Sequence, residues 1–412
     1  MGEPEELTWW ERFVDGLEEA VSECPVKKNE ALRGEEGWKK NEMDLLSLLY
    51  SRVLDQKSEE CEEVYRKRMM VESGGGSEEK GLDESGLDIR KVTSFREYWK
   101  SQWQGLYGSF EDVTLLNAMQ YTYHHAPPLA RPCDALQIFS AKVITDLRWP
   151  LHVFGVVALR DHVDRNRNLL FYSTRDNCQT LSETDPYLIL TGPTRPVVVT
   201  KDDPVMIEVY LKVKGDTENE DKYLVYFADN VQDSVASYIA GVSADNLYPI
   251  LCPSKHAMLE VRVGEIRSSV EATIFVRVAK GLLWPGGFHG HFAARTSSER
   301  QSVVLFDFGA DMVPVDGDGY MKLSRHVVSV ELEGSLQVYF MAWPDHKSFK
   351  ACQECNEVVN GEVRLNPEKA GRSYANFRLG SFEMEVIVAW SLVVPDPQPD
   401  VPDSFENYPH RA

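Results

Sequence analysis

Charged and turn-forming residues gather in one stretch of the sequence, between residues 148 and 195. Asp161 and Asp164 follow an alternating apolar run, and Arg175-Asp-Asn-Cys-Gln179 and Leu190-Thr-Gly-Pro-Thr-Arg195 come soon after it. Carboxylate, amide and guanidinium groups at loop entries can hold a polar ligand by charge-assisted hydrogen bonds. We therefore predict that a binding site, if the chain has one, lies here. Its residues would be Asp161, Asp164, Arg175, Asp176, Asn177 and Arg195.

Some of the same carboxylates allow a second interpretation, a calcium site. Asp161, Asp164 and Asp176 stand at loop entries, and Asp229 and Asp233 lie near a later loop. Calcium takes about six to eight oxygen ligands, and the Arg residues between these acids favour ion pairs instead. We expect no metal here. The string Val315-Asp-Gly-Asp-Gly319 is predicted to be a hairpin turn, because it lacks the closing Glu of a calcium loop.

Other residues that can bind metals or catalyse reactions stand without suitable partners. His289 and His291 would point to one face of a strand, but no third ligand is identifiable. Cys352-Gln-Glu-Cys355 supplies at most two zinc ligands. The sequence has no Gly-x-Ser-x-Gly elbow, no phosphate-binding loop and no dinucleotide fingerprint. We assign no catalytic residue and expect no metal or cofactor, which favours a protein that is not an enzyme.

Composition limits the partners. The 412 residues carry a formal net charge of −21, which disfavours binding to nucleic acid or to an anionic membrane surface. No apolar run reaches the length of about 18 residues that a membrane span needs, and Met1-Gly-Glu-Pro4 does not begin a secretory signal. Seven scattered cysteines do not form a disulfide framework. We expect a cytoplasmic or nuclear protein, and the sequence leaves its oligomeric state open.

Alternating apolar residues predict strands from about residue 134 onward. Val, Ile, Tyr and Phe are enriched, and Gly, Pro, Asp and Asn mark the breaks. The predicted strands are Leu136–Ser140, Leu151–Leu159, Asn168–Tyr172, Tyr187–Leu190, Val197–Thr200, Val205–Val213, Tyr223–Phe227, Met258–Ile266, Val270–Val278, Phe292–Ala294, Val303–Phe308, Val327–Leu332, Leu336–Trp343, Glu362–Leu365 and Met384–Val394. Strands at this spacing favour antiparallel β-sandwiches, which resemble a C2 module at most by analogy.

An internal repeat would explain the order of these strands. Four pairs of segments resemble each other in position and alternation: 153–160 with 273–280, 187–199 with 320–328, 204–212 with 334–341, and 258–263 with 384–389. The pattern predicts two sandwich lobes, residues 134–266 and 267–395. Repeated segments of this kind are typical of a structural framework.

The part of the chain before the strands has a different composition. Residues 1–71 are predicted to form an acidic helical region, partly disordered, whose helices could dock a protein partner. Glu72-Ser-Gly-Gly-Gly-Ser77 begins a flexible linker to residue 94. Residues 95–133 form an aromatic-rich lead-in, in which Phe95, Tyr98, Trp99 and Trp103 share one helix face. Residues 396–412 are a Pro-rich tail predicted to be disordered.

Several strings, in order, resemble an uncharacterised plant family found in cereals and other grasses. They lie within residues 95–395 and are Phe95-Arg-Glu-Tyr-Trp99, Gly108-Ser-Phe-Glu-Asp-Val-Thr114, Leu136-Gln-Ile-Phe-Ser140, Trp149-Pro-Leu-His-Val-Phe-Gly155, Arg175-Asp-Asn-Cys-Gln179, Asp185-Pro-Tyr-Leu188, Leu190-Thr-Gly-Pro193, Leu211-Lys-Val-Lys-Gly215, Val270-Glu-Ala-Thr-Ile274 and Leu323-Ser-Arg-His-Val-Val328. The resemblance implies a domain without an established activity, sometimes fused to a ribosome-inactivating rRNA N-glycosylase. Residues 1–90 lie outside it.

Three functions are consistent with the sequence. The first is a non-catalytic β-sandwich module for binding or scaffolding, in a stress or defence setting that the resemblance implies. The second is an enzyme related to ribosome-inactivating proteins, an rRNA N-glycosylase or another hydrolase. Against it, the nearest string to the glycosylase motif, Glu63-Val-Tyr-Arg66, lacks the flanking context. The third is a Ca²⁺- or lipid-binding module of the C2 type.

Overall fold

Antiparallel strands make up most of the described chain. The computed structural model describes residues 89–201, 203–231, 247–280, 288–299, 301–309, 314–344, 359–379 and 382–395. In chain order its elements are α3 (Ile89–Tyr107), β1 (Cys133–Thr145), β2 (Leu151–Arg160), β3 (Asn168–Ser173), β4 (Gln179–Leu181), β5 (Val197–Val198), β6 (Met206–Val213), the 3₁₀ turn η2 (Glu218–Glu220), β7 (Lys222–Asn230), β8 (Leu247–Pro253), β9 (Ala257–Lys280), β10 (Phe288–Thr296), β11 (Val303–Phe308), β12 (Val327–Glu331), β13 (Leu336–Pro344), β14 (Val359–Leu365), β15 (Ala370–Leu379) and β16 (Phe382–Ser391). The predicted fold class, mainly β with antiparallel sandwich lobes, is confirmed.

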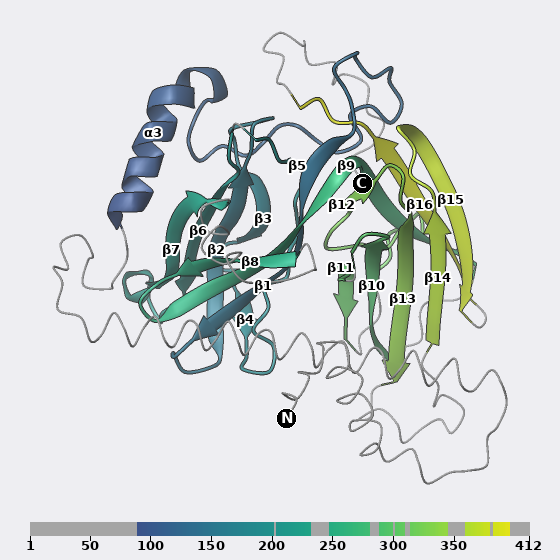
Figure 1. Ribbon diagram of the computed structural model, residues 1–412. Helices are drawn as coiled ribbons and strands as arrows, with labels where there is room; N and C mark the ends of the chain where they lie inside the picture. Colours follow the sequence, from purple (N-terminus) through teal and green to yellow (C-terminus); the bar gives the residue numbers. More distant parts are fainter. Residues whose placement is uncertain are drawn as a thin grey trace, which may run out of the picture. The chain divides into compact units, whose positions relative to one another are not determined.

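One long strand, β9, belongs to both lobes (Figure 1). Its first half pairs with β1 and β8, and its second half pairs with β16 and β12. The halves meet at Ser268, which has a left-handed backbone (φ 46°) and donates its N–H to Asp134. The predicted lobe boundary at residues 266 and 267 therefore falls inside a continuous strand, because no turn separates the two runs.

The two lobes have the same strand pairing. In the first lobe, β1 pairs with β5 and β9, β8 pairs with β9, and the second sheet has the order β3-β2-β6-β7. In the second lobe, the other half of β9 pairs with β12 and β16, β15 pairs with β16, and the second sheet has the order β11-β10-β13-β14. In the second lobe, the second half of β9 therefore corresponds to β1 of the first lobe. β16 corresponds to the first half of β9.

This pairing agrees with three of the four predicted segment matches and corrects one. The matches that agree are 197 with 327, 204–212 with 334–341, and 258–263 with 384–389. They correspond to β5 with β12, β6 with β13, and the first half of β9 with β16. The match of 153–160 with 273–280 is wrong, since β2 corresponds to β10 and not to β9. Alternation alone cannot distinguish one strand from its neighbour, because every half-buried strand repeats every two residues.

Each lobe has its own apolar core. The core of the first lobe comes from residues 136–263, and the core of the second comes from residues 270–392 together with Phe139. The lobes are also joined by polar contacts. The buried guanidinium of Arg325 donates to the carbonyls of Ile138 and Phe139, and the side chain of Gln137 accepts from Ser329 N–H. Burial lowers the pKa of Arg325 to about 10.

The two long strands that the sequence pattern missed, β8 and β15, occupy equivalent edges. β8 contains Pro249 and Pro253, and proline in a sheet is confined to edges because it cannot donate a ladder hydrogen bond. β15 carries exposed polar residues such as Arg372 and Asn376 on one side. Residues 187–190, predicted as a strand, form only an isolated bridge from Tyr187 to Lys142.

The helix α3 lies against β7 of the first lobe (Figure 1). It begins at Ile89, inside the segment predicted as linker, because Val92 is buried and Lys91 pairs with Asp229 on β7. Contacts with residues so far along the chain cannot be read from a local sequence pattern. The predicted helices of residues 1–71, the start of the linker and the tail at 396–412 lie outside the described residues. No described helix has both the length and the apolar character to cross a membrane.

Candidate functional site

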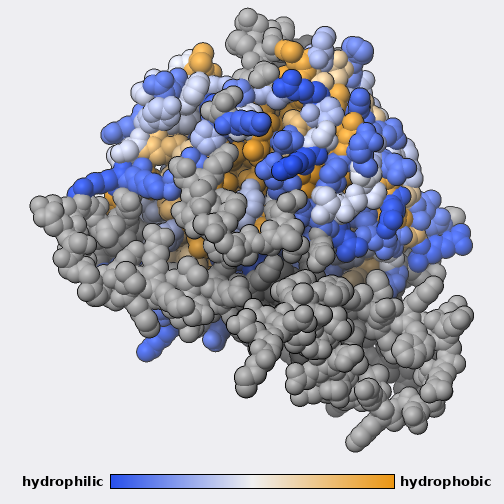
Figure 2. All heavy atoms as spheres, in the orientation of Figure 1, coloured by the Kyte–Doolittle hydropathy of each residue, from blue (hydrophilic) through white to orange (hydrophobic). Residues whose placement is uncertain are grey.

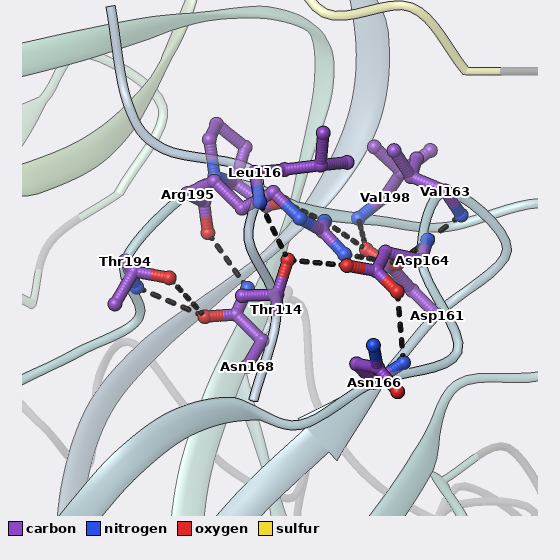
Figure 3. Close-up of polar contacts among 11 residues, drawn as sticks. Thr114, Leu116, Asp161, Val163, Asp164, Asn166, Asn168, Thr194, Arg195 and Val198 are labelled. Atoms are coloured by element: carbon purple, nitrogen blue, oxygen red, sulfur yellow. Dashed lines mark hydrogen bonds and ion pairs between the residues drawn. The ribbon is translucent and has the colours of Figure 1, made fainter. Parts of the chain in front are cut away.

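Asp161 and Arg195 form a buried ion pair at the end of β2 (Figure 3). Both nitrogens at the end of the guanidinium donate to the carboxylate, at 2.7 and 2.8 Å. The carboxylate also accepts the backbone N–H of Val198 on β5 at 2.8 Å and that of Val163 at 3.2 Å. Two of the predicted site residues are therefore in contact, and together they fix the loops after β2 and before β5.

Asp164 continues this network toward the segment after α3. Its carboxylate accepts the Thr114 hydroxyl at 2.5 Å and the backbone N–H of Asn166 at 2.9 Å. Asn168, at the start of β3, donates to the carbonyl of Arg195 and accepts from Thr194 (Figure 3). Asp161, Asp164 and Arg195, three of the six residues predicted for a binding site, thus meet in one polar cluster.

A second buried cluster lies beside the first, and sequence reasoning missed it. Glu208 of β6 is completely buried and accepts from both Arg160 and Arg167. The local pattern gave no signal for it, because Glu208 lies on the face of β6 opposite to the apolar residues Ile207 and Val209, where a charged side chain is ordinarily exposed. Two cations therefore share one carboxylate in this cluster.

Aromatic side chains cover these cations. The guanidinium of Arg160 lies 4.3 Å from the ring centroid of Phe110 and 5.0 Å from that of Trp99. Its nitrogens donate to the carbonyls of Phe110 and Arg165, and burial lowers its pKa. The Trp99 indole also donates to the Arg165 carbonyl, at 2.8 Å. The aromatic helix therefore packs on the charged loop of residues 160–168.

At its edge this network reaches solvent in what we name the Arg165 surface: Tyr98, Trp103 and Tyr107 of α3 with His162, Arg165 and Asp203. Arg165 lies 4.6 Å from the ring centroid of Trp103 and pairs with Asp203. His162 Nδ1 is 2.8 Å from the same carboxylate. Tyr98 is 60% exposed, and the His162 and Asp203 side chains are 32% and 27% exposed.

The aromatic residues of this surface are close to its charges. Trp103 and Tyr107 meet edge to face, with centroids 6.2 Å apart. Burial, followed by the negative charge of Asp164, raises the pKa of Tyr107, so its hydroxyl keeps its proton near neutral pH. Burial lowers the pKa of Arg165, and the nearby Tyr107, Asp161 and Tyr98 oppose that shift. The surface thus combines ring faces with fixed donors and acceptors.

Arg175, Asp176 and Asn177 lie elsewhere. They follow β3, whereas Asp161 precedes it, so a strand of about 20 Å separates the two groups. Arg175 pairs with Asp221 at 2.9 Å and donates to the Gly215 carbonyl. Its hydrogen bond lowers the pKa of Asp221. Asp176 and Asn177 are exposed in the turn. The structure does not bring the six predicted residues into one site.

The carboxylates considered as calcium ligands are engaged separately. Asp229 pairs with Lys91, and Asp233 lies outside the described residues. Within the described ranges, no three His, Cys, Asp or Glu residues are placed to hold a metal. Asp316 accepts the N–H groups of Asp318 and Tyr320, which confirms the predicted hairpin turn at 315–319. Cys352 and Cys355 are outside the described part of the chain.

His289 and His291 alternate along β10, as predicted for one face of a strand. His291 lies opposite Asp307 on β11. Burial lowers the pKa of His291, and the Asp307 charge opposes that shift. These residues belong to the second lobe, far along the chain from the Arg165 surface.

The chain belongs to the family described as a domain of unknown function, DUF6598, whose model matches residues 135–388. No curated protein matches it. Among solved structures, human GIVD cytosolic phospholipase A2 is similar over 64% of this chain and 33% of its own, at 8% identity and a TM-score of 0.21. A structure of Extended-Synaptotagmin 2 that includes its SMP domain is similar over 66% and 60%, at 10% identity and a TM-score of 0.21. The chain thus spans less than two thirds of either structure.

Proposed function

We propose that this DUF6598 protein is a non-catalytic β-sandwich binding module whose ligand occupies the Arg165 surface. The observation that carries the proposal is the position of Arg165, packed on the Trp103 ring near Tyr107 and paired in a partly exposed imidazole–carboxylate group. Binding sites combine apolar or aromatic contact area with a few precisely placed polar groups. The setting in plant stress or defence, which the family resemblance implies, is part of the same proposal.

The polar groups of this surface are held in place before any ligand arrives. The Arg165 carbonyl accepts from Trp99 and from Arg160, and the pair of Asp161 with Arg195 fixes the loop that carries His162. Groups fixed in advance lose little conformational freedom on binding. In this proposal Asp161, Asp164 and Arg195 support the site, while Arg175, Asp176 and Asn177 lie apart from it.

A library of uncharged polar fragments tests the proposal. In NMR spectra of the full chain, we expect fragments to shift the Trp103 indole signal, assigned by comparison with Trp103→Phe. The Trp390 indole is the internal control, because it is fully buried in the second lobe and donates a hydrogen bond to the Ser373 hydroxyl. Fragments that gather elsewhere and leave Trp103 unshifted would contradict the proposal.

The enzyme alternative rests on His162 and Asp203, because an imidazole held by a carboxylate can act as a general base. In the structure Arg165 also pairs with Asp203, so the carboxylate already neutralises a cation. We expect intact ribosomes incubated with the full chain to release no adenine. Release that disappears in His162→Asn would establish the enzyme and overturn the non-catalytic proposal.

Partner docking through residues 1–71 is a further part of the scaffold proposal and concerns residues outside those described. A pull-down that compares the proteins bound by the full chain with those bound by a chain that starts at residue 89 separates the two regions. Partners lost with residues 1–88 would support docking by the acidic region. Partners retained by both chains would assign the interaction to the β region instead.

A further inference from the structure

We propose that the Arg165 surface binds an uncharged glycan, an inference that rests on the proposed function and names its ligand class. Three features of the six residues lead to it: cancelled charge, aromatic side chains beside the polar groups, and polar groups already fixed in position. The cancelled charge disfavours charged ligands, and the polar groups disfavour a purely apolar one.

The charges of the surface cancel. Arg165 pairs with Asp203 through two nitrogens, and His162 shares that carboxylate. Beneath them, Asp161 pairs with Arg195. A phosphate or a carboxylate ligand would need a cation that is not already neutralised, and the chain as a whole carries −21. The surface therefore favours an uncharged ligand over a nucleotide, an acidic peptide or a sulfated sugar.

The rings offer flat apolar contact next to polar groups. Tyr98 is 60% exposed, while Trp103 and Tyr107 are half-buried and meet edge to face. A pyranose ring has one face of C–H groups, which packs on an aromatic ring, and a rim of hydroxyls, which need donors and acceptors. A purely apolar ligand would shut the partly exposed Asp203 carboxylate and His162 imidazole off from water, at a cost in binding free energy.

Asp203 has acceptor capacity left for such hydroxyls. A carboxylate offers about four lone-pair sites, and contacts from Arg165 and His162 occupy three of them in the structure. The Asp203 side chain is 27% exposed. Arg165 is itself buried, with its side chain 10% exposed, and its two hydrogen bonds to Asp203 hold that carboxylate in a fixed orientation. A sugar hydroxyl can therefore bind without rearrangement of the loop.

The test is binding of the full chain to an array of neutral and anionic oligosaccharides, followed by calorimetry with the best neutral one. We expect neutral oligosaccharides to bind. Tyr98→Ala should weaken binding about tenfold, which corresponds to about 1.4 kcal/mol. Tyr374→Ala, a change at a tyrosine of 57% exposure on β15, should leave the affinity within about twofold and is the matched control.

Asp203→Asn gives a second readout that loss of folding cannot imitate. It removes the charge that neutralises Arg165, so we expect binding to shift from neutral to acidic oligosaccharides. Binding by the unchanged chain to anionic oligosaccharides alone, or neutral binding that Tyr98→Ala does not weaken, would overturn the inference. If no oligosaccharide binds but fragments still shift Trp103, the glycan inference fails and the proposed binding surface stands. If fragments leave Trp103 unshifted, both fail.

Discussion

At the scale of single residues, the charged loop of residues 160–168 is stabilised by pairing. Its three arginines and Arg195 pair with three carboxylates, those of Glu208, Asp203 and Asp161, and most of these groups are buried. A buried charge is tolerated only when it is paired and hydrogen-bonded. These charge pairs therefore hold the loop in one conformation, including the part of it that belongs to the Arg165 surface.

Removing one member of the buried pair should cost more stability than removing both charges. Asp161→Ala leaves the Arg195 guanidinium buried without a carboxylate, and we expect a loss of about 3–5 kcal/mol in the free energy of unfolding. The double variant Asp161→Asn, Arg195→Met leaves no lone charge and should lose less. Urea unfolding followed by circular dichroism measures both. A double variant less stable than Asp161→Ala would show that hydrogen bonds, and not charge pairing, dominate.

Glu271 should make stability depend on pH. Burial raises its pKa to about 7, and hydrogen bonds from Met119 N–H at 2.5 Å and from Thr273 oppose the shift. Because the folded state holds this proton more tightly than the unfolded state, the free energy of unfolding should fall as pH rises from about 4.5 to about 7. The loss is about 3 kcal/mol, at about 1.4 kcal/mol for each pKa unit.

Glu271→Gln keeps an acceptor for Met119 and cannot ionise. Its stability relative to the unchanged chain should therefore rise between pH 5 and pH 8 by about 2.5 kcal/mol, since the rest of the change lies below pH 5. Urea unfolding of the two chains at both pH values gives this difference directly, because other titrating groups cancel. A difference that stays constant with pH would show that Glu271 has an ordinary pKa.

At the scale of elements, Trp99 is the larger of the two buried residues by which α3 packs on the first lobe. Trp99 is buried, contacts Arg160 and Phe110, and donates to the Arg165 carbonyl. Trp99 thus joins the helix to the loop that carries the proposed site.

The exposed surface of the described residues elsewhere is mixed. Figure 2 shows hydrophobic and hydrophilic residues interspersed on the coloured part of the face it draws.

Trp99→Ala should loosen α3 and the loop 160–168 together. Truncating a buried tryptophan costs about 3–5 kcal/mol, and here it also removes the cover over Arg160. Hydrogen exchange measured by mass spectrometry should rise in residues 89–107 and 160–168 and remain unchanged in β16. Tyr98→Ala, at the exposed neighbouring position, is the control and should leave exchange unaltered. Unchanged exchange in α3 of Trp99→Ala would show that other contacts hold the helix.

At the scale of the whole molecule, β9 prevents the lobes from being independent. Its first half completes the core of the first lobe and its second half begins that of the second. Arg325 and Gln137 add buried contacts between them. Loss of β9 from one lobe would expose backbone groups and apolar surface in the other.

We therefore expect the described unit to unfold in one transition. Urea curves from circular dichroism and from tryptophan fluorescence should coincide, because Trp99 and Trp149 lie with the first lobe and Trp390 lies in the core of the second. The β9 variant Val276→Asp, which buries a charge in the second core, should lower the midpoint of both probes. Two separate transitions would show that each lobe is stable without the other.

The sequence by itself determined the fold class and the positions of most strands, because the alternation of a half-buried strand is a local property. It also indicated Asp161, Asp164 and Arg195 as candidate binding residues, since charged residues at loop entries are visible in the chain. It missed the edge strands β8 and β15, where the pattern weakens.

Only the tertiary structure decided which residues meet. Asp161 and Arg195 are 34 positions apart, and Arg160 and Glu208 are 48 apart. Their contact depends on strand register, which the order of residues does not state. The same holds for the start of α3, for the single strand shared by two lobes, and for the separation of Arg175 from Asp161. Side-chain partners are set by long-range pairing, and the Arg165 surface exists only because that pairing brings α3, residue 165 and residue 203 together.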